Sequence, residues 1–233
     1  MKKSSLKNRT LSRLITIALL SSLAISSMFL MTSCTKNQNG DNSRSSSSSS
    51  SDQNSQSSTS SNDSITNEDA KRLVQSNPAP LSEADKLVSL QGYGSKGALA
   101  DQNLTIASML IYAIQDEYAA HGEYIAISDK FGKQNPYTNI IPSEETHINL
   151  LTELFKSYGM TVTEDTSSEH VVVPNSLLEA AQTGVQAEID NIAMYNKFLE
   201  KDLPQSVKDV FTTLRNASEK HLKAFNNQVS KLK

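Results

Sequence analysis

The second half of the chain repeats apolar residues every three or four positions in four long stretches, which is the spacing of amphipathic helices. The first stretch predicts a helix over residues 101–131, with Asp101 or Asn103 capping its start and Gly132 ending it. The apolar stripe of this helix consists of Ile106, Leu110, Ala113, Ile114, Tyr124, Ile127 and Phe131. A long helix with one buried face is therefore expected here.

The second stretch predicts a helix over residues 137–158. Pro142 falls in its first turns, where a proline is tolerated. Gly159 stands where a left-handed residue ends many helices. The apolar stripe contains Leu151, Leu154 and Tyr158.

Two further helices are predicted after residue 175. Ser176 and Glu179 have the spacing of a capping box, and the stripe behind them runs to about Leu203. Pro204 opens the fourth helix. The stripes of these two helices contain Leu178, Ala181, Val185, Ile189, Ile192 and Leu199, and then Val207, Phe211, Leu214, Leu222 and Phe225.

The connections between these helices predict their topology. The first and third connections are short, so each joins two antiparallel neighbours. The middle connection, residues 160–175, could span about 50 Å when extended, which exceeds the roughly 30 Å length of a 20-residue helix. The sequence therefore predicts an all-α bundle of two helical hairpins joined by one long crossover between the second and third helices.

Residues 67–100 have a weaker pattern and are expected to form an N-terminal extension that packs on the main domain, residues 101–233. Two segments, NEDAKRLVQS and SEADKLVSL, each predict a short helix, and QGYGSKG is expected to break the second. The stretch EHVVVP, residues 169–174, is the only candidate for a strand and is too short and isolated to form a sheet.

Residues 1–33 combine a basic start, an apolar run over residues 14–31 and small residues before Cys34. This order is typical of an export signal. The small residues before a lone cysteine resemble the bacterial lipobox, which implies cleavage before Cys34, lipid with acyl chains such as palmitate on its thiol, and an extracytoplasmic domain anchored to the membrane. The alternative is a free cysteine behind an uncleaved membrane anchor.

Composition narrows the remaining possibilities. Residues 34–66 are almost entirely Ser, Asn, Gln and Asp after Cys34, which predicts a disordered tether. Removing the five basic residues of the signal changes the net charge from −3 to −8, which argues against a nucleic-acid partner. Cys34 is the only cysteine, so disulfides and thiolate metal sites are excluded from the folded part.

Each long helix carries an acid or an imidazole within its apolar stripe. These residues are Glu117 on the first helix, Glu144 and His147 on the second, Glu188 on the third and His221 on the fourth. A buried carboxylate without a partner costs several kcal/mol, and a divalent cation is a partner that all of them can share. Glu144 and His147 are three residues apart, so they lie on one helix face. Carboxylate with imidazole suits iron, manganese or zinc.

The chain resembles the ferritin-like superfamily, whose rubrerythrin-type members place Glu, Glu-x-x-His, Glu and Glu-x-x-His on four helices. It is most similar to the exported ferritin-like proteins of the DUF2202 family, through QDEYAAHGEY, NIIPSEETHINLLTELFKSYGM, SLLEAAQTGVQAEIDNI and LRNASEKHLKAF. The resemblance implies a ferritin-like four-helix bundle. It also implies metal ligation by Glu117, Glu144, His147, Glu188 and His221.

One position departs from that layout. Ser218 stands where the fourth helix of a full di-iron site has a glutamate, and Glu219 follows about 100° further round the helix, where it is expected to face solvent. We therefore expect one well-held metal ion, or two with water filling the gap. His121, four residues after Glu117, is either an additional ligand or a histidine at the bundle edge. Tyr124 and Tyr195 are either hydrogen-bond partners of the ligands or ordinary core aromatics.

Three functions follow from this site. The first is a membrane-anchored metalloprotein, with iron as the first candidate, that reacts with peroxide or oxygen and takes electrons from an external reductant, since no cysteine-rich electron-transfer module is present. The second is a non-catalytic module that binds a metal ion, with zinc or manganese as other candidates. The third is a structural or interaction domain whose metal site has degenerated.

Overall fold

The computed structural model describes residues 67–74 and 78–233, and all of them lie within one compact unit, Ser58–Lys233. The described part contains helices and no strand, which confirms the all-α prediction. Its elements are α1 (Asn67–Val74), α2 (Gly94–Ala100), α3 (Ile106–Phe131), α4 (Tyr137–Ser157), the 3-10 turn η1 (Ser167–Glu169), α5 (Leu177–Leu199) and α6 (Gln205–Leu232). The predicted signal at 1–33, the lipid site Cys34 and the tether to residue 66 lie outside the described residues.

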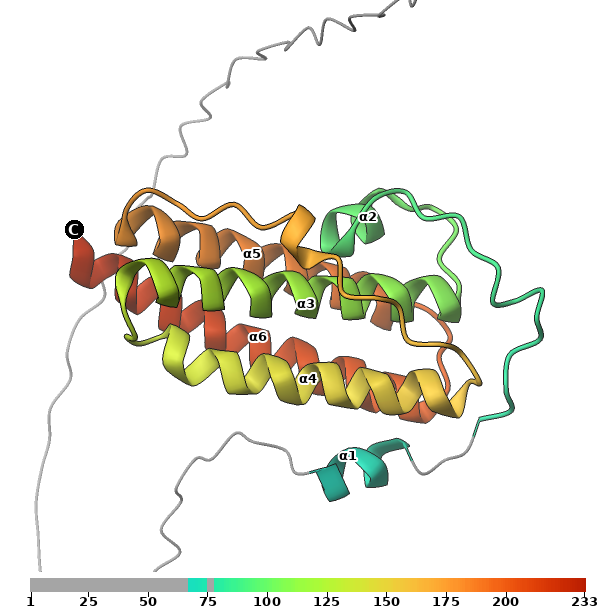
Figure 1. Cartoon of the computed structure of the whole chain (residues 1–233). Helices are drawn as coiled ribbons and strands as arrows, with labels where there is room; N and C mark the ends of the chain where they lie inside the picture. Colours follow the sequence, from blue (N-terminus) through green and yellow to red (C-terminus); the bar gives the residue numbers. More distant parts are fainter. Residues whose placement is uncertain (1–66, 75–77) are drawn as a thin grey trace, which may run out of the picture. The chain divides into compact units, whose positions relative to one another are not determined.

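The four long helices form two antiparallel hairpins that pack on each other. Helix α3 packs on α4 and α5 on α6, while α3 also contacts α5 and α4 contacts α6. The connection from α4 to α5 runs back along the bundle and includes η1, which contacts α3 (Figure 1). As a result, all four neighbouring pairs are antiparallel and the long crossover returns the chain to the end where α4 began (Figure 1).

The helix ends agree with the sequence at several positions. Gly132 and Gly159 both have positive φ, 86° and 64°, which is why glycine stands there. The Ser176 hydroxyl accepts the Glu179 N–H at the start of α5. The Glu179 carboxylate accepts the N–H of Asn175, one residue before the cap. The start of α5 is thus held from both sides.

The residue predicted to cap the start of α3 was wrong. Neither Asp101 nor Asn103 caps this helix; Thr105 does, through a reciprocal capping box with Ser108. The Asp101 carboxylate is engaged elsewhere, because it accepts the Asn103 N–H at 2.8 Å and the Tyr112 hydroxyl at 3.0 Å. The carboxylate that the sequence offered as a cap instead fixes the loop before α3.

The predicted position of the second short helix was also wrong. The segment SEADKLVSL forms a turn, held by the Asp85 N–H donating to Ser82 Oγ, and the helix lies instead in GSKGALA, where a break was expected. The glycines are present because α2 lies very close to its neighbours: a Cβ on Gly97 would fall 2.5 Å from the Gly92 backbone and 2.7 Å from the Tyr112 ring. Close packing on α3 therefore outweighs the low helix propensity of glycine.

Buried apolar residues form two clusters at different levels of the bundle. The larger surrounds Leu110, Leu154, Phe198 and Phe211, and the smaller surrounds Tyr124, Tyr137 and Phe225. Ser108 and Ser206 are buried at the starts of α3 and α6, and the other buried polar residues of the long helices fall between the two clusters: Glu117, Glu144, His147, Glu188, Asn191, Ser218 and His221. A polar layer therefore crosses the core of the bundle.

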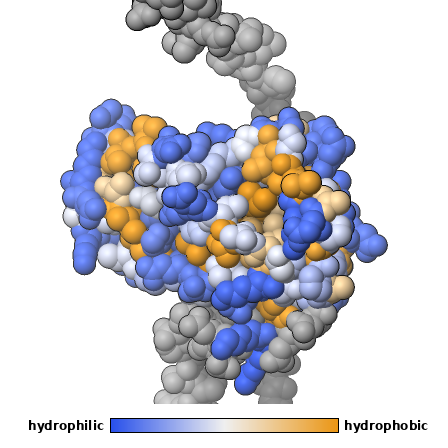
Figure 2. All heavy atoms as spheres, turned by 45° about the vertical axis from the view of Figure 1, so that its right-hand side comes forward, coloured by the Kyte–Doolittle hydropathy of each residue, from blue (hydrophilic) through white to orange (hydrophobic). Residues whose placement is uncertain are grey.

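The surface of the described part is mostly hydrophilic, with separate hydrophobic areas on the face that Figure 2 shows. Leu87 and Val172 are the most exposed large apolar residues, at 83% and 75%. Among the described helices, none combines the length and the hydrophobicity that crossing a membrane requires.

Candidate metal centre

Five acidic and imidazole side chains meet in the polar layer, and every long helix contributes at least one. The structure places Glu117 on α3, Glu144 and His147 on α4, Glu188 on α5 and His221 on α6. All five are buried, with exposed fractions of 8% or less. The residues that the sequence singled out on four separate stripes are thus brought into one cluster.

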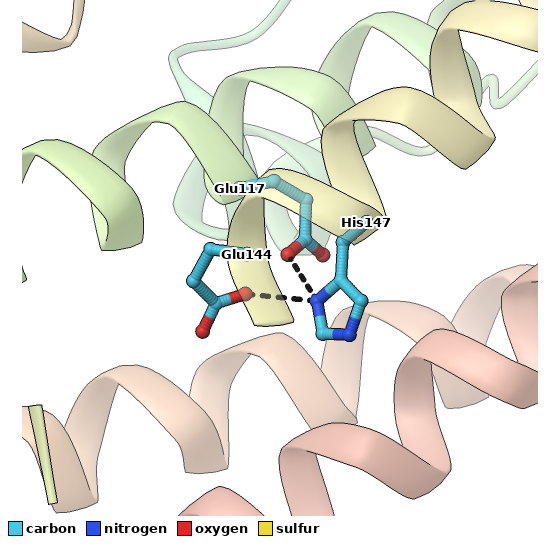
Figure 3. Close-up of side chains that lie close together, drawn as sticks. All are labelled: Glu117, Glu144 and His147. Carbon is cyan, nitrogen blue, oxygen red and sulfur yellow. Dashed lines mark hydrogen bonds and ion pairs between the residues drawn. The ribbon is translucent and has the colours of Figure 1, made fainter. Parts of the chain in front are cut away.

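The first half of the cluster lies between α3 and α4 (Figure 3). His147 Nδ1 is 3.0 Å from Glu117 Oε2 and 2.8 Å from Glu144 Oε2. Glu144 and His147 reach this point together because residues three apart on a helix share a face. Two carboxylates and one imidazole nitrogen therefore converge on one small volume.

The second half lies among α4, α5 and α6. His221 Nδ1 is 3.2 Å from Glu144 Oε1 and 3.5 Å from Glu188 Oε1. Despite these short distances, the nitrogen is not oriented for a hydrogen bond and remains a buried polar atom without a partner. Such atoms are rare in folded proteins, and a cation between the three side chains would give this nitrogen one.

Glu144 belongs to both halves. In each of the two sets, Glu117–Glu144–His147 and Glu144–Glu188–His221, one ligand atom from every residue lies within 4.8 Å of the others. The donors are three carboxylates and two imidazoles, which suit a divalent transition metal. The residues present therefore fit one or two such ions, with Glu144 placed to contact either.

The titration behaviour of the cluster reflects burial and mutual attraction. Burial raises the pKa of Glu117 to about 7, although His147 opposes the shift, and burial likewise raises the pKa of Glu188. Burial lowers the pKa of each imidazole, but the neighbouring carboxylates raise it by more. The resulting pKa is about 10 for His147 and about 9 for His221. The pKa of Glu144 lies below its usual range because the two imidazoles outweigh the effect of its burial.

Two tyrosines orient the outer carboxylates. The Tyr195 hydroxyl donates to Glu117 Oε1 at 2.6 Å, and the Tyr124 hydroxyl donates to Glu188 Oε1 at 2.8 Å. The arrangement is reciprocal, because each tyrosine lies seven residues after one glutamate of the pair and contacts the other across the α3–α5 interface. Of the two readings left open by the sequence, the hydrogen-bonding one holds for both tyrosines.

Ser218 takes part in a polar network instead of the carboxylate contacts. Its hydroxyl donates to Asn191 Oδ1 at 2.7 Å, and Asn191 Nδ2 donates to Asp116 Oδ2 at 2.9 Å. Asp116 in turn accepts the Ser95 N–H from the start of α2. Neither Asn191 nor Asp116 was predicted from the sequence, although Asn191 lies three residues after Glu188 and so shares its helix face.

Two other histidines lie away from the cluster. His121 Nε2 is 3.4 Å from Glu145 Oε1 at the bundle edge, and neither residue belongs to the ligand sets. His170 stacks on Tyr93 with ring centroids 3.8 Å apart. Of the two alternatives for His121, the structure therefore supports a histidine at the bundle edge.

Glu219 faces solvent as expected, with its carboxylate 3.9 Å from Arg215 Nε.

A cavity of about 470 Å³ reaches the cluster from the surface. Its lining includes the exposed Lys96 and four buried residues of the polar layer, Glu117, Glu144, Glu188 and Ser218. Ser218 thus stands where the carboxylates meet a space large enough for a small molecule.

Comparisons with known proteins identify the family. None of the curated proteins matches the chain. The crystal structure of a hypothetical protein from Methanococcus jannaschii DSM 2661 is similar, with a TM-score of 0.49 and 23% sequence identity over 57% of this chain and 85% of that one. A family model described as an uncharacterized protein domain, DUF2202, matches residues 106–232, from the start of α3 to the end of α6. The chain therefore belongs to the DUF2202 family.

Proposed function

We propose that this chain is a ferritin-like protein that binds one or two divalent transition-metal ions in the core of its bundle, with iron as the first candidate and zinc or manganese as alternatives. The observation that carries the proposal is the convergence of Glu117, Glu144, His147, Glu188 and His221, all buried and contributed by four helices. Ferritin-like connectivity is supported by the two hairpins and the single long crossover.

Charge balance supports a bound cation. Three buried carboxylates carry three negative charges, and two imidazoles can supply at most two positive ones. The remaining carboxylate needs a proton or a metal, because an unpaired buried charge costs several kcal/mol. Divalent ions bound by neutral imidazoles would each bring two positive charges in place of the imidazole protons, and one of them would give the unpartnered His221 Nδ1 a contact.

The cavity favours a redox function over the binding of an ion that small molecules cannot reach. It reaches Glu117, Glu144 and Glu188 beside Ser218, so a small oxidant such as peroxide or oxygen has a route to the cluster. Bound iron would supply the electron-transfer chemistry. The chain's own residues would hold the ion, while Tyr124 and Tyr195 orient the outer carboxylates. An external reductant completes the proposal, since Cys34 is the only cysteine.

The second candidate is a module that binds a metal without turnover, and the third is a structural domain with a degenerate site. Ser218 favours the second candidate over the redox protein, because its hydroxyl donates to Asn191 and supplies no carboxylate to the cluster. These three functions differ in the amount and the reactivity of the metal.

Metal content distinguishes them. Residues 58–233 form a compact unit with its own apolar clusters and should fold alone. Purified from iron-supplemented cells, this unit should contain one or two iron ions by elemental analysis, and its visible absorption should change on adding peroxide. One ion with no spectral response supports the binder. No retained metal, and no rise in melting temperature on adding iron, zinc or manganese, contradicts metal binding altogether.

We also propose that the chain is exported and anchored to a bacterial membrane by lipid on Cys34, with residues 34–66 as the tether. The basic, apolar and small residues before Cys34 support this. Cells fed labelled palmitate should label the full chain but not Cys34→Ala, and the unsubstituted protein should be shorter than the variant, which keeps residues 1–33. Equal labelling, or equal length of the two proteins, would contradict lipid anchoring.

A further inference from the structure

One hydroxyl group contacts both imidazoles of the cluster. Ser143 Oγ lies 3.2 Å from His147 Nε2 and 3.2 Å from His221 Nε2. His147 follows four residues later on the same helix, whereas His221 comes from α6. The two rings are nearly parallel, with centroids 5.7 Å apart and an interplanar angle of 26°. Ser143 thus contacts the nitrogen of each ring that does not face the carboxylates.

The position of the ring protons decides whether an imidazole can hold a cation. A neutral imidazole carries one N–H, and only its other nitrogen has a lone pair for a ligand. A hydroxyl oxygen can accept two hydrogen bonds but can donate only one. Ser143 can therefore accept an Nε2–H from both rings at once, and this is the arrangement in which both rings offer Nδ1 to a cation.

We propose that Ser143 is a positioning residue that holds both imidazoles with their protons on Nε2 and their Nδ1 atoms toward the carboxylates. The Nδ1 positions agree with this, because His147 Nδ1 is 2.8 Å from Glu144 and His221 Nδ1 is 3.2 Å from it. The corresponding position on α6, directly before Ser218, is Ala217, which has no hydroxyl. Helix α4 therefore supplies this contact for both histidines.

The effect of Ser143 on metal affinity rests on the proposed metal-binding function. The two hydrogen bonds between Ser143 and the imidazoles do not depend on that function. Partners that fix the tautomer of a ligand histidine typically change metal affinity about 10- to 100-fold when they are removed. Since Ser143 serves two rings, its loss should weaken both ligand sets, whereas a residue that served one ring would weaken one.

Nitrogen-15 NMR of histidine-labelled residues 58–233 tests the proposal, with Zn²⁺ as a diamagnetic probe. In the zinc-loaded protein, both rings should carry a slowly exchanging proton on Nε2. Ser143→Ala should speed the exchange of both protons by about tenfold or more, and should weaken zinc binding about 10- to 100-fold. Ser143→Thr, which keeps a hydroxyl, should restore both properties.

Ser157→Ala is the matched control, because the Ser157 hydroxyl on the same helix donates only to the Leu154 carbonyl. It should leave zinc affinity and histidine exchange unchanged. Nε2–H exchange on both rings that is equally slow with and without the Ser143 hydroxyl, in a folded variant, would overturn the proposal. If zinc does not bind the unsubstituted protein, the proposed function fails, and the Nε2–H exchange rates of the metal-free protein still decide the role of Ser143.

Discussion

At the scale of single residues, Glu144 has a position that no other member of the cluster shares. Its two carboxylate oxygens contact different imidazoles, Oε2 with His147 and Oε1 with His221. Glu117 and Glu188, in contrast, each belong to one ligand set and are each held by one tyrosine. Removing Glu144 should therefore weaken both ligand sets, and removing either outer glutamate should weaken one.

Substitution of Glu144 by Gln should abolish binding at both ligand sets, because an amide oxygen is neutral and each set loses its shared carboxylate. Calorimetric titration of residues 58–233 with Fe²⁺ or Zn²⁺ measures the stoichiometry. Glu117→Gln should remove only one of the two binding events. Glu145→Gln is the control, since Glu145 is the neighbouring exposed acid. Unchanged titrations of the Glu144 variant would rule out this site.

Ser218→Glu should add the carboxylate that the site lacks. Because Ser218 borders the cavity, a longer side chain has space on that side, and the variant should bind the second ion more tightly. The change also removes the hydrogen bond to Asn191, so Ser218→Ala, which loses this bond without gaining a carboxylate, serves as the control. A second-ion affinity that falls to the level of the control would show that the missing carboxylate does not limit binding.

The five cluster residues could be predicted from sequence because each interrupts an apolar stripe, which is a signal within one helix. The contacts of Ser143, Asn191 and Asp116 could not. Ser143 reaches His221, which is 78 residues away in the chain, only after α4 and α6 pack together. Hydrogen-bond partners across an interface have no periodicity of their own to reveal them.

At the scale of helices, close approach explains several residues that propensity alone would not select. Gly184 lies inside α5, and a Cβ there would fall 2.7 Å from the Phe225 ring of α6. Gly97 has the same role between α2 and α3. The sequence predicted the four long helices from their stripes, but missed α2 and the Thr105 cap, because these depend on tertiary contacts that override glycine propensity and engage Asp101 elsewhere.

Gly184→Ala should therefore destabilise the bundle by about 1–3 kcal/mol through overpacking, although alanine is the better helix former. Urea unfolding of residues 58–233 followed by circular dichroism measures the change. Because the clash involves a ring and not backbone, adding Phe225→Leu should recover part of the loss relative to the sum of the two single variants. Strictly additive effects would contradict a direct contact between the two positions.

At the scale of the whole molecule, the polar layer divides the apolar core into two clusters. Leu154 and Phe211 belong to one and Tyr137 and Phe225 to the other. Stability at this layer depends on the charges of the cluster, and these depend on pH when no metal is bound. Since the layer crosses all four long helices, its electrostatics influence every helix contact at that level.

The metal-free protein should lose stability as the pH rises. Glu117 has a pKa of about 7 when folded against an ordinary 4.5, so its contribution is full below pH 4.5 and is lost as the pH rises through 7. The pKa is about 10 for His147 and about 9 for His221, against an ordinary 6.5. Their contributions to stability are therefore full below pH 6.5, and they are lost as the pH rises through 9 for His221 and through 10 for His147. The free energy of unfolding should fall between pH 6.5 and 10.

Urea unfolding of metal-free residues 58–233 at pH 6.5, 8 and 9.5 tests this expectation. His221→Gln should give a shallower dependence on pH, because one of the titrating groups is gone. His121→Gln should leave the dependence unchanged, since His121 lies outside the cluster. A free energy of unfolding that stays constant or increases over this range would contradict the assigned protonation states.

The two ligand sets differ in how much of the chain each one needs. Glu117, Glu144 and His147 all belong to α3 and α4, so residues 106–157 hold a complete set. The other set needs Glu144 together with a residue of α5 and one of α6. During synthesis the first set is complete before α5 exists, and the second closes only when the last helix arrives. An ion bound early would therefore stabilise the hairpin of α3 and α4. An ion bound later would hold the hairpin of α5 and α6 against it.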